Sequence, residues 1–218
     1  ERLSSGLRIN KAADDAAGLA ISERMGNQVR SMQQAHRNVQ QANNLLQTAE
    51  GGMSEISNIL GRMRELAVQS ASDTVSGNTA TGATATGDRA SLQDEFTAMK
   101  DEIHRIASST KYNGIALLDG SFSSNEIQVG PGSTDAISNV TIQNFKITSN
   151  TSFATASGGA DVTAATFTLA NREDAQTTIG TLDTMIDAVG AERSNVGSLQ
   201  NRLEYTSSNL MNSIQNNA

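Results

Sequence analysis

The sequence predicts a mainly α-helical protein with a small β part, in which long helices at both ends of the chain pack into an elongated bundle. The prediction rests on apolar residues that recur every seven positions, first near the start of the chain and again near its end. A strict seven-residue repeat keeps one stripe of a helix facing a partner helix. The two repeats are Met25, Met32, Val39, Leu46, Met53, Leu60 and Ala67, and then Leu182, Val189, Val196, Leu203 and Leu210.

The first helix is predicted over about 14–70, with Asn10, or Asp14 with Asp15, as the start signal. Further apolar residues lie on both sides of its seven-residue stripe. The buried face is therefore wider than the seam of a two-stranded coiled coil, which favours a bundle. These flanking residues are Leu45, Ile59 and Leu66 on one side and Ala35, Ala42, Ala49, Ile56 and Met63 on the other.

Two adjacent glycines, Gly51 and Gly52, interrupt this first helix. Each costs about 1 kcal/mol relative to alanine in a helix interior. The apolar register nevertheless continues unbroken from Leu46 to Met53 and Leu60. We therefore predict one continuous helix with a soft point at the two glycines.

A second, shorter helix is predicted after a loop. Residues 73–87 read DTVSGNTATGATATG, a small, polar and glycine-rich stretch without periodicity, which indicates a loop. Over about 88–109, apolar residues recur at steps of three and four, as they do on one face of a helix. This helix is short enough to pack antiparallel onto the distal part of the first. Its stripe consists of Leu92, Phe96, Met99, Ile103 and Ile106.

Beyond the second helix the pattern changes to turns and alternation. Asn113-Gly114 is a turn dipeptide, and apolar residues alternate with polar ones on both sides of the Gly-Pro-Gly turn at 130–132. A β-hairpin over about 115–143 is the economical interpretation. The alternating residues are Ile127, Val129, Val140 and Ile142.

The middle of the chain, 148–171, is rich in Ser, Thr, Ala and Gly. It suits either a few short strands or an irregular surface loop, and the pattern leaves both open. The last helix is predicted to begin near Arg172 or Asp174 and to carry the second seven-residue repeat through 172–218.

Composition excludes several classes of function. A formal net charge of −7, with dispersed basic residues, leaves no basic patch for a phosphate backbone, so nucleic acid is not an expected partner. No run approaches the roughly 18 apolar residues of a membrane span. The absence of cysteine leaves the redox compartment open. A single proline, Pro131, lets the chain refold without slow isomerisation steps, which suits transport through a narrow channel but is equally explained by chance.

Enzymatic chemistry finds no support in the residues, so neither a catalytic residue nor a cofactor or metal site is predicted. His36 and His104 lie on different predicted helices, and the sequence contains no HExxH zinc motif. It also contains no GxSxG elbow and no cysteine nucleophile. Asp14 and Asp15 are interpreted as acids that favour the positive end of a helix dipole.

Four stretches of the chain carry distinctive motifs. They are ERLSSGLRINKAADDAAGLAISERM at 1–25, GRMRELAVQSASDT at 61–74, KYNGIALLDGSF at 111–122 and GAERSNVGSLQNRLEYTSSNL at 190–210. Together these motifs resemble bacterial flagellins, and the resemblance extends over about 1–147 and 172–218.

The resemblance implies that the three helices bundle into the inner domain of a flagellar filament, with the hairpin packed alongside. It divides the chain into an N-terminal part of this core domain at 1–147, a short variable surface region at 148–171, and a C-terminal helix at 172–218 that completes the core. It further implies that the chain is a core fragment without the terminal polymerisation helices of full flagellins.

The function that the resemblance implies is that of a non-enzymatic structural subunit, secreted and polymerised outside the cell for motility. The implied partners are other flagellin subunits, an export chaperone, hook-associated cap proteins and the vertebrate Toll-like receptor that senses flagellin. Two alternatives stay open: a flagellin-like cell-surface protein that binds polysaccharide or a host surface, and a hook-filament junction protein. The binding alternative requires exposed aromatic side chains, for which the candidates are Tyr112, Phe122, Phe145 and Phe153.

One face of the first helix is the candidate contact site. Arg62, Leu66 and Gln69 are spaced four and three residues apart and therefore share this face. From the residues alone it is a solvated face beside the core residue Met63. The resemblance implies instead that this face, with Glu95 on the neighbouring helix, contacts adjacent protofilaments and the Toll-like receptor. Arg62 would offer a planar fork of donors and Leu66 an apolar anchor beside the core.

Overall fold

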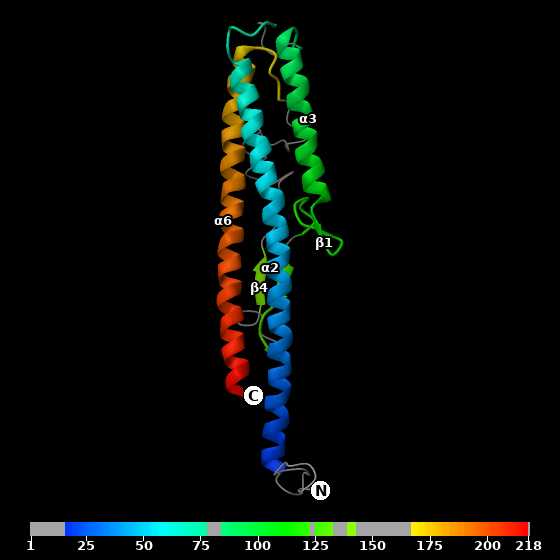
Figure 1. Ribbon diagram of the computed structural model, residues 1–218, viewed down its shortest axis with the longest axis vertical. Helices are drawn as coiled ribbons and strands as arrows, with labels where there is room; N and C mark the ends of the chain where they lie inside the picture. Colours follow the sequence, from blue (N-terminus) through cyan, green and yellow to red (C-terminus); the bar gives the residue numbers. More distant parts are fainter. Residues whose placement is uncertain (1–15, 78–83, 123–124, 133–138, 143–166, 218) are drawn as a thin grey trace. The chain divides into compact units, whose positions relative to one another are not determined.

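Helices dominate the computed structural model, which describes residues 16–77, 84–122, 125–132, 139–142 and 167–217. Within these residues the chain forms three helices and four short strands (Figure 1). The helices are α2 (Ala16–Ser70), α3 (Asp88–Ser109) and α6 (Arg172–Asn217). The strands are β1 (Lys111–Tyr112), β2 (Ile115–Ala116), β3 (Asn125–Gln128) and β4 (Asn139–Ile142). The predicted fold class, mainly α with a small β part, is confirmed, and the three predicted helices are present within the described residues. The predicted start signals of the first helix, Asn10 or Asp14 with Asp15, lie outside the described residues.

The chain divides into two compact units. Helices α2 and α6 contribute residues to both units, whereas α3 belongs entirely to unit 2. Of the described residues, unit 1 contains 16–44, 126–132, 139–141 and 200–217, and unit 2 contains 45–77, 84–122, 125, 142 and 167–199.

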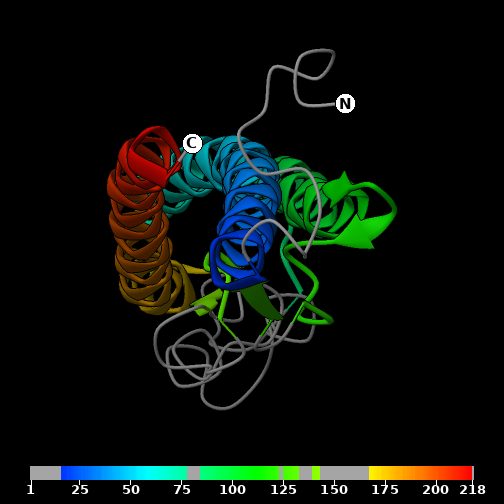
Figure 2. The same cartoon turned by 90° about the horizontal axis from the view of Figure 1, so that it is seen from below.

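In unit 2, α3 and α6 both run antiparallel to α2. The hydroxyl of Ser70, the last residue of α2, donates to the carbonyl of Leu169, just before α6 begins, at 2.7 Å. Arg89, in the first turn of α3, donates to the Ser70 carbonyl at 3.1 Å. Both helices thus start beside the end of α2 and return along it, as predicted for α3; Figures 1 and 2 show α2 between them.

The two seven-residue stripes form the cores of the units. Full burial of one such apolar side chain contributes about 1.5–3 kcal/mol, because its surface leaves water. On α3 the stripe is partly covered: Phe96 and Ile103 are buried, whereas Met99 is half-buried. The buried stripe residues of α2 and α6 are Met32, Val39, Leu46, Met53, Leu60 and Ala67, and Leu182, Val189, Val196, Leu203 and Leu210.

Met25 departs from the predicted stripe, since it is 37% exposed. All residues of α2 from 20 to 28 are exposed. A stripe position is buried only where a second element lies across it, and here the described residues leave a groove that Met25 lines together with Asn217 of α6. The repeat therefore predicts which face of the helix is apolar but not how far along the helix that face is covered.

The glycine pair does not interrupt α2, which is continuous as predicted. The two glycines differ in their surroundings. A Cβ at Gly51 would meet no atom within 4 Å, whereas a Cβ at Gly52 would lie 2.8 Å from Leu118 Cδ1 and 2.8 Å from Thr110 Oγ1. Gly52 therefore allows the segment that follows α3 to approach the α2 backbone closely.

Gly51→Ala is expected to raise the free energy of unfolding by about 1 kcal/mol, because alanine is the better helix former. Gly52→Ala gains the same propensity but crowds Leu118, which is fully buried, and Thr110, whose hydroxyl donates to the Ile106 carbonyl. It should therefore melt below Gly51→Ala in thermal denaturation followed by circular dichroism. Equal melting temperatures would show that this close approach does not limit packing.

A buried arginine from α3 caps the C-terminal end of α2. Arg89 is 4% exposed, and its Nε and Nη2 donate to the carbonyls of Ser70 and Ser72, each at 3.1 Å. Ser70 is the last residue of α2, and the last carbonyls of a helix lack partners within the helix and carry the negative end of its dipole, so the cation stabilises this end; Ser72 lies in the turn that follows. This contact also fixes the start of α3 to the end of α2.

Asn171 caps the start of α6. Its Oδ1 accepts a hydrogen bond from the backbone N–H of Asp174 at 2.9 Å, and its Nδ2 donates to the Asp174 carboxylate at 2.6 Å. Such a side-chain cap satisfies an N–H group that the first turn leaves unpaired. Glu173 and Asp174 suit the positive end of the dipole. The predicted helix start is confirmed, although the sequence reasoning did not identify the cap.

The segment before α6 is held against α3. The side-chain amide of Gln93 donates to the Phe167 carbonyl at 3.2 Å and accepts from the Leu169 N–H at 2.7 Å, as a neighbouring strand would. The rings of Phe96 and Phe167 pack with their centroids 5.7 Å apart. The remainder of the predicted variable region, 148–166, lies outside the described residues.

The strands form two pairs, β1 with β2 and β3 with β4, instead of the single predicted hairpin. In the first pair Tyr112 lies opposite Ile115, so only Asn113 and Gly114 connect the strands. Their φ angles of 49° and 80° occupy the left-handed region that a two-residue hairpin turn requires. The β3–β4 pair confirms the predicted hairpin, but its predicted start at about 115 is wrong because Ile115 pairs back across the tighter turn.

In unit 1, β3 is attached to α2. The Asn38 side-chain amide donates to the Gln128 carbonyl at 3.0 Å. The Gln128 side chain donates in turn to the carbonyls of Gly130 and Gly132 at 2.7 and 2.8 Å, which closes the turn after the strand. Val129, between β3 and this turn, is buried. One amide side chain thus shapes the turn that the Gly-Pro-Gly motif predicted.

Candidate functional site

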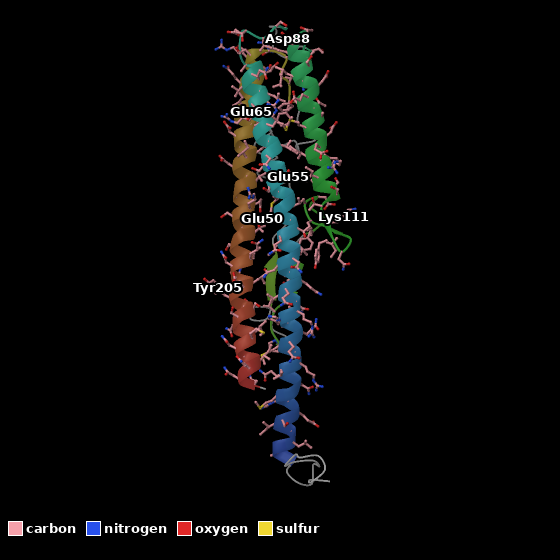
Figure 3. The ribbon with its side chains drawn as sticks, in the orientation of Figure 1. Glu50, Glu55, Glu65, Asp88, Lys111 and Tyr205 are labelled. Carbon is pink, nitrogen blue, oxygen red and sulfur yellow. The ribbon has the colours of Figure 1, made fainter. Side chains whose placement is uncertain are left out.

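Arg62 of α2 forms two ion pairs on an exposed surface. Its Nη1 lies 2.9 Å from Glu65 Oε2, and its Nη2 lies 3.0 Å from Glu95 Oε1 on α3. The structure thus brings Arg62 and Glu95 together, as the resemblance implied; Figure 3 marks the position of Glu65 on α2. Hydrogen bonds to Glu65 and then Glu95 raise the pKa of Arg62, and an arginine is charged at neutral pH in any case. Exposed pairs stabilise little but orient the guanidinium.

Leu66 does not share this exposed surface. It is 1% exposed and belongs to the buried face that it was predicted to widen, so it offers no exposed apolar side chain for the expected anchor. The reason is the width of the buried arc on α2. Because both α3 and α6 pack against this part of the helix, the arc extends from Ala67 past Met63 to include Leu66.

Gln69 is exposed, as predicted, and its neighbour Val68 is 49% exposed. Val68 follows Arg64 by four residues and Glu65 by three, so it lies on the charged side of α2. This spacing from Arg64 and Glu65 is the signal by which the sequence could have identified Val68 as an exposed residue. We refer to Arg62, Glu65 and Gln69 of α2 with Glu95 of α3 as the Arg62 surface, which Val68 flanks.

A further ion pair joins α2 to α6. Arg64 donates from Nε and Nη2 to the two carboxylate oxygens of Asp183, at 2.5 and 3.3 Å. The hydrogen bond from Arg64 lowers the pKa of Asp183, so the carboxylate is ionised at neutral pH. Sequence reasoning missed this pair because the two residues are 119 positions apart and helical periodicity relates only residues of one helix.

Clusters with metal-binding composition were not found in the described part of the chain, where no three His, Cys, Asp or Glu side chains gather to hold an ion. His36 and His104 lie on α2 and α3 respectively, and His104 is exposed. Of the helices that the structure describes, none is long and apolar enough to cross a membrane.

The aromatic residues proposed for carbohydrate binding do not form an exposed platform in the described residues. Phe122 is 5% exposed, so its expected place on such a surface is wrong, because the ring is among the buried hydrophobic side chains. Tyr112 is half-buried. Phe145 and Phe153 lie outside the described residues.

Residues 1–123 match the family described as the bacterial flagellin N-terminal helical region. The chain belongs to the bacterial flagellins. The resemblance inferred from the four motifs is thereby confirmed. Flagellins are structural proteins, and the flagellar filament is extracellular.

Curated flagellins are similar to this flagellin chain over almost its whole length. The flagellin of Halalkalibacterium halodurans is 42% identical over 99% of this chain and 72% of its own length. The flagellin of Bacillus subtilis is 39% identical, over 99% of this chain and 75% of its own. The flagellar filament 30.7 kDa core protein of Treponema maltophilum is 37% identical, over 96% and 71%.

A solved structure supports the same assignment. The crystal structure of Bacillus cereus flagellin superposes with a TM-score of 0.59 and 33% sequence identity, covering 80% of this chain and 88% of that one. The helical fold of this flagellin chain is therefore the fold of its family.

Proposed function

We propose that this flagellin chain is a structural, non-catalytic subunit of a flagellar filament, exported from the cell and polymerised outside it. The observation that carries the proposal is its similarity, over nearly the whole chain, to a protein named as a flagellar filament core protein. The helices suit this role, because their apolar stripes are buried within each unit while their opposite faces are exposed. When one face of a subunit contacts a different face of the next, the repeated contact builds an open helical filament unless it closes into a ring.

Deletion of the gene that encodes this chain tests the proposal. Electron microscopy should show cells without filaments, and swimming in soft agar should be lost and then restored by complementation. Filaments of normal number and length in the deletion strain would refute the structural role. If filaments persisted while attachment to polysaccharide or host cells was lost, the cell-surface binding alternative would replace it.

The Arg62 surface is the part of this subunit that we propose contacts neighbouring subunits. Its charges are exposed, and the two carboxylates hold the guanidinium ready to form further hydrogen bonds with carbonyls or carboxylates of a partner. Val68 supplies the exposed apolar side chain that Leu66 does not. The similarity between the 61–74 stretch and the flagellin motif supports the same assignment.

Arg62→Ala combined with Gln69→Ala is expected to weaken filaments without unfolding the subunit, because both side chains are exposed. Filaments should depolymerise at a lower temperature than wild-type filaments, as measured by light scattering. The matched control is Arg105→Ala, which removes an exposed arginine whose ion-pair partner among the described residues is Glu102, three positions earlier on α3. If the depolymerisation temperature fell equally in the double variant and in the control, the cause would be a general charge effect, and the Arg62 surface would be removed from the proposal.

Recognition by the vertebrate Toll-like receptor that senses flagellin is a second proposed role of the Arg62 surface. Arg62→Ala with Gln69→Ala should reduce receptor activation in a reporter-cell assay by about tenfold or more, equivalent to about 1.4 kcal/mol. Arg105→Ala should signal like the parent. A double variant that keeps its helicity and full activity would show that the receptor does not use this surface.

An export chaperone and hook-associated cap proteins are further partners that we propose for this chain on its family membership. A chain with no cysteine and only Pro131 refolds after export without disulfide or slow proline steps, which supports passage in an unfolded state. No described residue favours a polysaccharide as a partner over the chaperone and the cap proteins.

A further inference from the structure

The seven methionines of the chain fall into classes of very different exposure. Met211 on α6 is 53% exposed, and Met25 on α2 is 37% exposed. Met99 is half-buried. The other four are at most 3% exposed; they are Met32, Met53, Met63 and Met185.

The two exposed methionines both belong to unit 1 and sit on helical backbone. Met25 lines a groove of about 540 Å³ together with Ile21, Val29 and Asn217. Met211 follows Leu210, which is buried, so the two neighbouring side chains point to different sides of α6. Their thioether groups are thus open to small solutes while the helices around them stay intact.

We propose that Met211 and Met25 are sites of reversible oxidation by peroxides in the folded protein. The thioether sulfur attacks one peroxide oxygen, the O–O bond breaks, and a sulfoxide forms while the second oxygen leaves as water. The sulfur loses two electrons and hydrogen peroxide gains them. This chemistry is independent of filament formation, so the proposal goes beyond the proposed function.

The position of each methionine decides whether the fold survives the reaction. At Met211 and Met25 the new S=O group points into water, where its hydrogen-bonding capacity is satisfied. At Met53, Met63 or Met185 the same group would be buried among apolar side chains without a partner. Oxidation of the folded protein is therefore fast at the two exposed residues and slow at the buried ones, and methionine sulfoxide reductases can reverse it at the exposed ones.

The reaction changes a surface without changing the fold. Met25 contributes an apolar wall to the groove, and a sulfoxide converts that wall into a polar one. Met211 likewise changes from an exposed apolar side chain to a polar one. Unit 1 thus carries two positions at which an extracellular oxidant alters the polarity of exposed helix faces.

Peroxide treatment of the intact chain at neutral pH, followed by trypsin digestion and mass spectrometry, tests the proposal. Cleavage after arginine separates the informative methionines, because each lies in its own peptide. The Met25 and Met211 peptides should gain one oxygen at least about tenfold faster than the Met53 and Met185 peptides, with unchanged helicity. In guanidinium chloride, which unfolds the chain, the four peptides should gain oxygen at similar rates. The peptides are 25–30 and 203–218 for the fast class and 38–62 and 173–193 for the slow class.

Leucine variants provide the matched controls, because leucine conserves volume and cannot be oxidised in this way. Met25→Leu with Met211→Leu should abolish the fast oxygen uptake, whereas Met185→Leu should leave it intact. Equal rates for Met211 and Met53 in the folded chain, or a fast phase that survives in the double variant, would overturn the assignment. Failure of a methionine sulfoxide reductase to restore the oxidised folded chain would overturn its reversibility.

Discussion

Leu46→Asp should leave the chain unfolded or melting far below the parent. Leu46 is fully buried in the middle of the α2 stripe, so an aspartate there either buries an unpaired charge or must be protonated. Substitutions of this kind belong to the most severe class, which lowers the free energy of unfolding by about 4–5 kcal/mol or more. That is a large part of the roughly 5–15 kcal/mol by which whole domains are stable. Circular dichroism during heating and urea denaturation measures the loss.

Gln47→Asp is the matched control for this variant. Gln47 is adjacent to Leu46 but exposed, so the same aspartate there stays in water and should change stability by less than about 0.5 kcal/mol. Similar melting temperatures for Leu46→Asp and Gln47→Asp would mean that the assignment of the stripe is wrong.

Leu66→Ala is expected to lower the free energy of unfolding by about 2–5 kcal/mol, the usual cost of removing a buried leucine side chain and leaving a cavity. Its side chain is 1% exposed between α2 and the helices that pack on it in unit 2. Urea denaturation with a tryptophan-independent signal, such as ellipticity, suits this chain because it contains no tryptophan.

Val68→Ala, two residues away, is the control for Leu66→Ala. Val68 is 49% exposed, so its truncation removes little buried surface and should cost less than about 1 kcal/mol. Equal losses for the two variants would contradict the buried position of Leu66. The difference also matters for recognition experiments, because reduced signalling by a Leu66 variant would report loss of the fold and not loss of a contact.

Local periodicity was sufficient to predict the helices. The interpretation of 88–109 as a helix matches α3, and the predicted first helix matches α2 within the described residues. The continuity of α2 through Gly51 and Gly52 was also predicted, because a seven-residue register is lost if a helix breaks between repeats. Each of these features depends on residues of a single helix, which a sequence presents in order.

The candidate site was only partly predictable. The proximity of Arg62 and Glu95 was predicted from the family resemblance, and in the structure Arg62 Nη2 lies 3.0 Å from Glu95 Oε1. Leu66 was predicted both to widen the buried face of the first helix and to serve as a contact anchor beside the core, and its 1% exposure agrees only with the first. The partnership of Arg64 with Asp183 was not predicted, because it depends on the register between α2 and α6.

The sequence by itself determined the helical segments, the apolar face of each helix and the family, because these follow from residue spacing and from motifs that are contiguous in the chain. Only the tertiary structure decided which parts of each face are covered, so that Leu66 is buried while Met25 is exposed. It also decided that the buried Arg89 donates to the Ser70 carbonyl at the end of α2, and that a Cβ at position 52 would lie only 2.8 Å from Leu118 Cδ1. The physical reason is that burial depends on the number and register of neighbouring elements, which are set by contacts between residues far apart in the chain.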